Sequence, residues 1–103
     1  MTCSRNDVVL LPIPFTDLTS RKVRPAIVVG RKGTDLFVVP VSSVLPNTDC
    51  LLQDWQAAGL NVASGMKAQL ATIEERLVVR IVGSITAADR QSLDDRLRTW
   101  LQI

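Results

Sequence analysis

The sequence predicts a mainly β fold, a small antiparallel barrel or sheet with one C-terminal helix packed on it. Short apolar and β-branched runs alternate with turn residues, which is typical of strands. Two of these runs flank the glycine-containing turn RKGTD, which predicts a hairpin. Residues 86–103 have helical spacing, and the length of 103 residues fits one domain, residues 1–103.

The first half of the chain predicts three strands. Residues 7–14, DVVLLPIP, are apolar and β-branched, and their prolines indicate an early end or an edge position. The polar residues 15–22 predict a loop. Residues 24–30 and 36–44 predict the two strands of the hairpin, and Pro40 indicates a bulge or an edge position in the second one.

The second half predicts two more strands and two helices. Residues 51–60, LLQDWQAAGL, suit a short helix with Gly59 just past its end. Residues 64–73 and 77–85 have the apolar character of strands.

The last element is a helix that begins after Thr86. Thr86 is followed three residues later by Asp89, which is a capping signature. The apolar residues that follow recur at helical spacing and predict a stripe that packs on the sheet: Leu93, Leu97, Trp100 and Leu101.

The composition excludes several kinds of chemistry. The chain has no histidine and no tyrosine, so neither histidine acid–base catalysis nor a histidine-ligated metal is available. No nucleotide-binding glycine motif and no carboxylate cluster with metal-ligand spacing occurs in the sequence. We therefore expect no metal and no cofactor. The net charge of +2 tolerates a polyanionic partner but does not by itself indicate one.

The cysteines and the absence of a leader indicate a cytoplasmic protein. Cys3 and Cys50 lie far apart and form no CxxC pair, which fits a reducing compartment. The start MTCSRNDVV lacks the pattern of a signal peptide, and no apolar run approaches the ~18–20 residues that span a bilayer. We expect no association with membranes.

Arginine, lysine, hydroxyl and amide groups are the chemistry that remains. Such groups suit RNA, whose own 2′-OH lies beside the phosphate and can attack it. Arg24, in KVRPAIVVG, offers a planar fork for phosphate oxygens, but it could equally form an ion pair with Asp17. Ser42 and Ser43 end the strand VVPVSS, where strand-end turn chemistry is the simpler explanation.

Lys67 and Gln69 alternate along the strand predicted over residues 64–73. They could line a groove, or they could simply form a solvated strand face. None of these residues is specific by itself.

Taken together, three blocks of the sequence resemble the MazF/PemK family, the toxins of bacterial type II toxin–antitoxin systems. The block DVVLLPIPFTDLTSRKVRPAIVVG resembles the family's first strand, proline-rich turn, loop and R-P-A strand. VVPVSS resembles the strand that ends in two hydroxyl residues. The stretch from DWQAAGL to IVGSI, followed by a helix, resembles the remainder, so the likeness covers nearly the whole chain.

The resemblance implies a fold, an activity and partners. The fold would be the SH3-like barrel with a C-terminal helix that is also called the CcdB/PemK-like toxin fold. The activity would be that of a metal-independent endoribonuclease, or mRNA interferase, that leaves 2′,3′-cyclic phosphate and 5′-OH ends on single-stranded RNA. The partners would be a second copy of the chain, as a homodimer, and a cognate antitoxin protein.

The resemblance also implies site residues. Arg24 and Ser42 correspond to the family's catalytic arginine and hydroxyl residue, while the expected RNA-binding residues are Phe15, Thr16, Ser43, Lys67, Gln69 and Thr72. The chain departs from the family pattern at two positions. Asn6 replaces the glycine of the G-D pair, and Ala68 replaces an aspartate that some members carry near the threonine turn.

Two other functions remain open from the sequence. A closely similar fold serves the CcdB toxins, which bind DNA gyrase and do not cut RNA, and fold alone cannot separate these activities. The chain could also be a degenerate member of the family that binds only an antitoxin or a nucleic acid.

Overall fold

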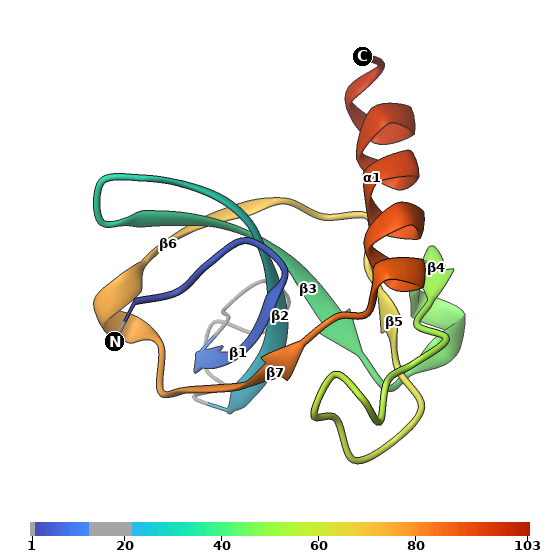
Figure 1. Cartoon of the computed structure of the whole chain (residues 1–103), viewed down its shortest axis with the longest axis horizontal. Helices are drawn as coiled ribbons and strands as arrows, with labels where there is room; N and C mark the ends of the chain where they lie inside the picture. Colours follow the sequence, from blue (N-terminus) through green and yellow to red (C-terminus); the bar gives the residue numbers. More distant parts are fainter. Residues whose placement is uncertain (1, 13–21) are drawn as a thin grey trace.

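Seven strands and one α-helix make up the part of the chain that the computed structural model describes, residues 2–12 and 22–103 (Figure 1). The strands are β1 (Asp7–Pro12), β2 (Val23–Lys32), β3 (Asp35–Ser42), β4 (Cys50–Leu51), β5 (Gly65–Met66), β6 (Ala71–Glu74) and β7 (Arg80–Ser84). Helix α1 spans Ala87–Leu101, and two short 3₁₀ helices span Leu45–Asn47 and Glu75–Leu77. The helix rises from one end of the sheet, as Figure 1 shows.

The strands form one antiparallel sheet in the order β4-β5-β3-β2-β1-β7. Strands β2 and β3 form the expected hairpin, which turns at Gly33 and Thr34. On its other edge β3 pairs first with β6, through residues 35–38, and then with β5, through residues 41–42. The single strand predicted over residues 64–73 is therefore two short strands, because β3 changes its partner between them.

Pro40 lies at this change of partner. Its carbonyl accepts a hydrogen bond from the backbone N–H of Lys67 at 2.9 Å, and its missing N–H falls in the gap between the β5 and β6 pairings. The bulge that Pro40 led us to expect lies instead in β2, where Val29 has no partner between Val28 and Gly30.

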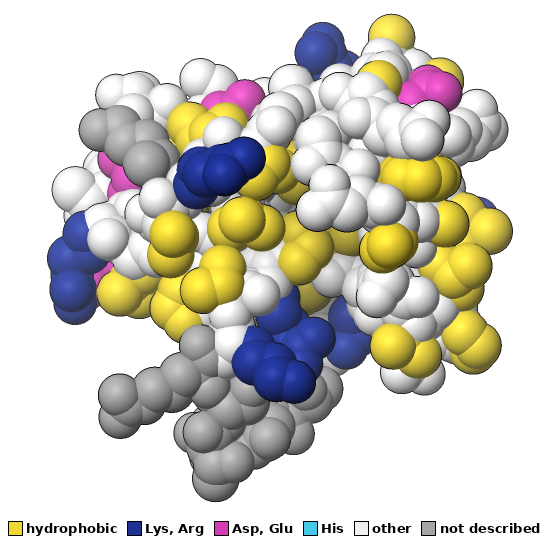
Figure 2. Space-filling view, turned by 90° about the horizontal axis from the view of Figure 1, so that it is seen from below, with side chains coloured by type: hydrophobic (Ala, Val, Ile, Leu, Met, Phe, Trp, Pro, Cys, Tyr) yellow, Lys and Arg dark blue, Asp and Glu magenta, His cyan; other side chains and the backbone are white. Residues whose placement is uncertain are grey.

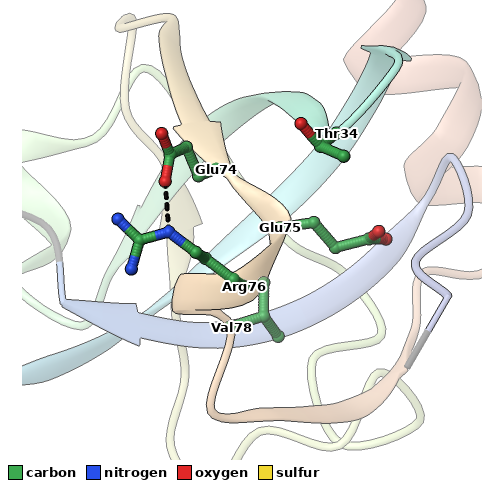
Figure 3. A pocket seen from close by; sticks show the side chains of 5 residues that line it. All are labelled: Thr34, Glu74, Glu75, Arg76 and Val78. Atoms are coloured by element: carbon green, nitrogen blue, oxygen red, sulfur yellow. Dashed lines mark hydrogen bonds and ion pairs between the residues drawn. The ribbon is translucent and has the colours of Figure 1, made fainter.

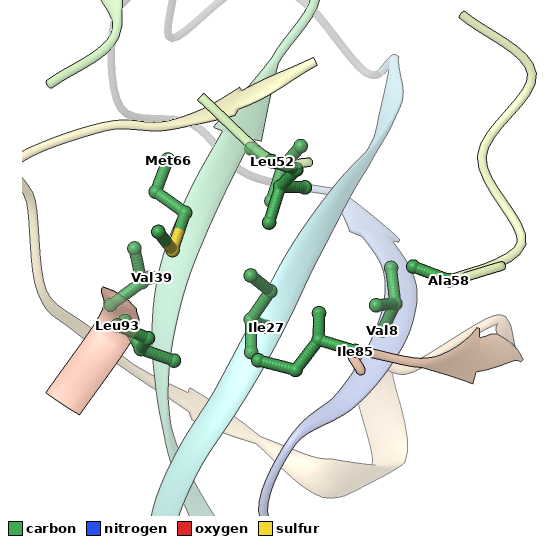
Figure 4. Close-up of a cluster of buried hydrophobic side chains, with 9 residues drawn as sticks. Val8, Ile27, Val39, Leu52, Ala58, Met66, Ile85 and Leu93 are labelled. Carbon is green, nitrogen blue, oxygen red and sulfur yellow. The ribbon is translucent and has the colours of Figure 1, made fainter. Parts of the chain in front are cut away.

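The sheet is buried on both faces, which explains why its strands are continuous apolar runs. Neighbouring residues alternate between two clusters, so that Val8 and Ile27 pack on one side and Val9 and Val28 on the other. Leu93 of α1 packs into the first of these clusters together with Val39, Met66 and Ile85 (Figure 4). The strand runs are apolar on both faces because the helix covers one and the curled sheet covers the other.

Helix α1 begins where the sequence predicts, but its capping residues make different contacts. Thr86 is the N-cap position, yet its hydroxyl donates to Asp54 at 2.6 Å and not to the helix. The carboxylate of Asp89 is fully buried and accepts the backbone N–H groups of Gln53 and Asp54, both at 2.9 Å. The helix start therefore anchors the loop of residues 52–64. Leu101, predicted to pack on the sheet, is 49% exposed.

The helix predicted over residues 51–60 is wrong. Leu51 belongs to β4, and the residues after it form successive turns. The backbone N–H groups of Gly59 and Leu60 donate to carbonyls three and five residues back, so the segment closes in irregular turns without a regular helical ladder. Gly59 has a φ of 91° and touches β7, because a Cβ on it would lie 2.2 Å from the Val82 carbonyl oxygen.

Asn6 shows why a glycine would suit its position. Its φ is 77°, in the left-handed region, and its backbone is fixed by hydrogen bonds to Val28 and Ile85. Asparagine tolerates this region better than other residues with a side chain, so the replacement of the family's glycine is conservative in conformation.

We expect Asn6→Gly to leave the free energy of unfolding within about 1 kcal/mol of wild type, and Asn6→Ala to lower it by about 1–2 kcal/mol relative to Gly. Urea unfolding with an unchanged m-value measures both effects. Equal stabilities of the Gly and Ala variants would contradict the role assigned to φ.

Candidate anion-binding pocket

A pocket of about 350 Å³ lies where β2 begins and β3 ends. The ends of β1, β2, β3 and β7 form its floor, and the loop of residues 52–64 forms one wall. Its lining residues are Leu10, Arg24, Pro25, Val41, Ser42, Ser43, Gly59, Leu60, Asn61, Val62, Ser64, Arg80 and Val82. The pocket therefore brings together Arg24, Ser42 and Ser43, three of the residues singled out in the sequence.

The hairpin register explains why Arg24 and Ser42 meet. Ala26 pairs with Pro40, and the same register continued by two residues places Arg24 opposite Ser42. Directly opposed residues of antiparallel strands lie about 4.5–5.5 Å apart and point to the same face.

The bulge at Val29 sets this pairing. Near the turn, Gly30 pairs with Phe37. If the strands continued from there without a bulge, Arg24 would lie opposite Ser43. A slip of one residue moves side chains to the other face of a strand, so the bulge decides which hydroxyl accompanies the guanidinium.

Arg80 reaches the same pocket from the other side of β1. Leu10 pairs with Pro25 on β2 and with Arg80 on β7. Strands β2 and β7 therefore flank β1, and their backbones are about 10 Å apart, two strand spacings. The pocket carries one arginine on each of these strands.

The pocket is electropositive. No Asp or Glu is among its lining residues, and within residues 2–12 and 22–103 neither Arg24 nor Arg80 forms an ion pair. Five other arginines in those ranges contact a carboxylate: Arg5, Arg31, Arg76, Arg96 and Arg98. Figure 2 views the molecule from this end, where Lys and Arg side chains gather beside apolar ones. Unneutralised guanidinium groups suit a ligand with phosphate groups.

The hydroxyl groups supply further donors. The Oγ of Ser42 accepts the backbone N–H of Val44 at 3.0 Å, which leaves its own O–H available to a ligand. Ser64 donates to the carbonyl of Val62 at 2.9 Å, inside the loop wall. Ser42 is therefore the hydroxyl best placed to act with Arg24.

The other predicted RNA-binding residues do not line this pocket. Lys67 and Gln69 lie in the irregular segment between β5 and β6, and Thr72 pairs with Phe37 at the far end of β3. The side-chain oxygen of Gln69 is buried without a partner in the described chain. Phe15 and Thr16 lie outside the described residues. An RNA-binding role for these five residues, and for Ser43, stays a prediction.

Arg80 and Asn61 are pocket residues that the sequence analysis did not single out. Arg80 lies within the strand predicted over residues 77–85 and opens the observed β7, and its charge inside an apolar run was the one available signal. Arg80 lies near Arg24 only because β1 pairs with β7, and these two strands are about seventy residues apart in the chain. Asn61 directly follows residues 51–60, the segment wrongly predicted to be a helix.

A larger depression of about 640 Å³ lies on another part of the surface, and it is less suited to a phosphate ligand (Figure 3). Its lining includes Glu74, Glu75 and Arg76, and Figure 3 shows Glu74 and Arg76 pointing toward each other. Hydrogen bonds from Arg31, and from the backbone N–H of Cys3, hold the pKa of the Glu75 carboxyl below its usual range. Each of these carboxylates is paired with an arginine, Glu74 with Arg76 and Glu75 with Arg31, so neither guanidinium is free to bind a phosphate.

Two further observations concern the described ranges only. In residues 2–12 and 22–103, no group of three or more His, Cys, Asp or Glu side chains could hold a metal ion. The helix in that part of the chain is too short and too polar to cross a membrane.

The fold and the pocket together define a small antiparallel β domain with one C-terminal helix and an arginine-lined anion pocket at the strand ends. Neither a protein-family model nor a curated protein matches the chain. Several solved structures match it. The toxin MazF-mt6 of Mycobacterium tuberculosis aligns with a TM-score of 0.76 and 16% identity over 94% of this chain and 97% of its own.

Two other similar structures are endoribonucleases from mycobacterial species. One, in complex with its cognate antitoxin, aligns with a TM-score of 0.74 and 15% identity over 98% of this chain and 94% of its own. The other has a TM-score of 0.69 and 18% identity over 100% of this chain and 94% of its own. The expected mainly β, CcdB/PemK-like toxin fold is thus confirmed, and the likeness at these identities concerns the fold.

Proposed function

We propose that this protein is the toxin of a type II toxin–antitoxin system and a MazF-like endoribonuclease that cleaves single-stranded RNA. The observation that carries the proposal is the placement of Arg24 opposite Ser42 in a pocket with no Asp or Glu among its described lining residues. The fold shared with a MazF toxin and with two endoribonucleases supports it. A cytoplasmic location would follow from an mRNA substrate.

The proposed reaction uses the RNA as its own nucleophile. The 2′-oxygen attacks the adjacent phosphorus, the bond from phosphorus to the 5′-oxygen breaks, and the products carry a 2′,3′-cyclic phosphate and a 5′-OH. The proton of the 2′-OH leaves to a base, and the departing 5′-oxygen gains a proton. No step of this scheme calls for a metal ion.

Arg24 and Ser42 would act on the charge that develops during this reaction. The guanidinium has a pKa above about 12 and is a poor base, so its role is to stabilise the negative charge of the pentacoordinate phosphorane. The Ser42 O–H donates to an oxygen of the same phosphate. Positioning and electrostatic stabilisation would then supply most of the rate enhancement.

The proposed partners follow from the same likeness. One of the similar structures is bound to its cognate antitoxin, and we propose that this chain also binds an antitoxin and forms a homodimer. Co-expression with the product of a neighbouring small reading frame should relieve its toxicity.

The decisive experiment is cleavage of an RNA oligomer with one 2′-deoxy sugar. We expect the all-ribose oligomer to be cut, with cyclic phosphate and 5′-OH ends identified by mass spectrometry, and the oligomer that is 2′-deoxy at the cut site to stay intact. Cleavage of the substituted oligomer would refute internal attack.

The same assay separates the alternatives. Intact RNA together with inhibited DNA supercoiling would identify a CcdB-like gyrase-binding toxin. Binding of RNA or antitoxin without cleavage would identify a degenerate member of the family.

A further inference from the structure

We propose that Arg80 binds a second phosphate of the RNA, next to the one held by Arg24, and so sets the position of the strand in the pocket. This inference rests on the proposed function. It assigns to Arg80 a positioning role in substrate binding and no part in the chemical step.

The placement of the two arginines favours two different phosphates. Arg24 lies opposite Ser42, so its phosphate is held between β2 and β3. Arg80 lies on β7, beyond β1, with the backbones of β2 and β7 about 10 Å apart. On β1 between them, Leu11 pairs with Arg24 and Leu10 pairs with Arg80, so the two arginines are also offset by one residue along the strands. An RNA backbone that crosses these strand ends would present successive phosphates to the two groups.

The surroundings of Arg80 also favour a ligand over a structural role. Its side chain is exposed, and in the described part of the chain it contacts no carboxylate and makes no hydrogen bond. By contrast, the exposed arginines Arg76, Arg96 and Arg98 each contact a carboxylate, and Arg90 on the helix donates to the carbonyl of Ile85. An unneutralised charge at the mouth of a pocket is available to a polyanion.

The expected kinetic signature follows from the distance to the reacting group. A phosphate that does not react carries the same charge in the ground state and in the transition state. Contacts to it therefore strengthen binding uniformly and affect KM more than kcat. Each neutralised phosphate of a single strand also adds about 0.7 to the slope of log K against log salt.

The test compares Arg80→Gln and Arg80→Lys with Arg76→Gln, which removes an exposed arginine outside the pocket. Binding of a fluorescent, fully 2′-O-methylated oligomer, which cannot be cleaved, is measured by anisotropy between 50 and 200 mM salt. We expect Arg80→Gln to weaken binding about ten-fold and to reduce the salt slope by about 0.7, while Arg80→Lys keeps the slope and Arg76→Gln changes neither. Circular dichroism confirms that the variants are folded.

Single-turnover cleavage at saturating RNA gives the second readout. The proposal predicts that the rate constant of Arg80→Gln stays within about three-fold of wild type. It is overturned by an unchanged affinity and salt slope, or by a rate loss as large as that of an Arg24 variant. Because the methylated oligomer is never cut, failure of the endoribonuclease activity itself would leave the binding test of Arg80 intact.

Discussion

We expect Arg24→Ala to lower kcat for the proposed RNA cleavage by about 10²–10³, the loss typical of removing one donor to a developing oxyanion. The reason is that Arg24 and Ser42 line one pocket from facing strands, with no Asp or Glu among the described residues that line it. Both donors would contact the phosphate whose charge increases in the transition state. The interaction is therefore stronger in that state than with bound substrate, and the loss should fall on kcat.

Two variants make this result specific. Arg24→Lys keeps the charge but not the planar fork, so its kcat should lie between those of wild type and Arg24→Ala. Ser43→Ala tests the register, because the bulge at Val29 places Ser42 opposite Arg24. We expect Ser42→Ala to reduce kcat by more than Ser43→Ala. Defined RNA oligomers and purified proteins give these rates, and activity of Arg24→Ala within a few-fold of wild type would remove Arg24 from the mechanism.

The strand positions of the candidate site were accessible from the sequence because they depend on local patterns. The apolar and β-branched runs give β1, β2 and β3, and the turn at Gly33 joins the last two into a hairpin. Arg24 and Ser42 then lie at the open ends of that hairpin. The pairing of Arg24 with Ser42 differs by one residue from the register that the turn alone would set. This difference comes from the bulge at Val29, and no residue type in the sequence indicates that bulge.

The parts that the sequence analysis missed depend on contacts between distant segments. Arg80 joins Arg24 only because β7 pairs with β1. The residues LLQDWQAAGL have good helix formers, yet Gly59 approaches the Val82 backbone of β7 and Asp89 fixes the start of the segment against α1. Contacts with distant parts of the chain thus outweigh a weak local preference. The local periodicity of the sequence does not indicate tertiary contacts of this kind.

The Gly59–Gly83 contact decides whether the loop wall of the pocket stays in place. A Cβ at Gly83 would lie 2.4 Å from the Ala58 carbonyl oxygen and 2.7 Å from its carbon, both of them backbone atoms. Gly59 meets Val82 in the same way from the opposite side. The loop and β7 therefore approach at backbone distance, and no rotamer change can relieve an added methyl group.

We expect Gly83→Ala to lower the free energy of unfolding by about 3 kcal/mol, and Tm by about 12–20 °C, since overpacking against rigid backbone forces the two segments apart. Gly30→Ala is the matched control, because its Cβ would meet only the Phe37 ring at 3.4 Å. That variant should lose less than about 1 kcal/mol. Thermal unfolding followed by circular dichroism gives both values.

Displacement of the loop should also reduce cleavage, because Gly59, Leu60, Asn61 and Val62 line the pocket beside Arg80. In the folded Gly83→Ala variant at low temperature, we expect faster hydrogen exchange in residues 52–64 and weaker RNA binding. The sheet that carries Arg24 and Ser42 should keep its protection. A variant with wild-type exchange in this loop and an unchanged Tm would show that β7 and the loop do not pack at backbone distance, and the pocket would then lack the wall on which its shape depends.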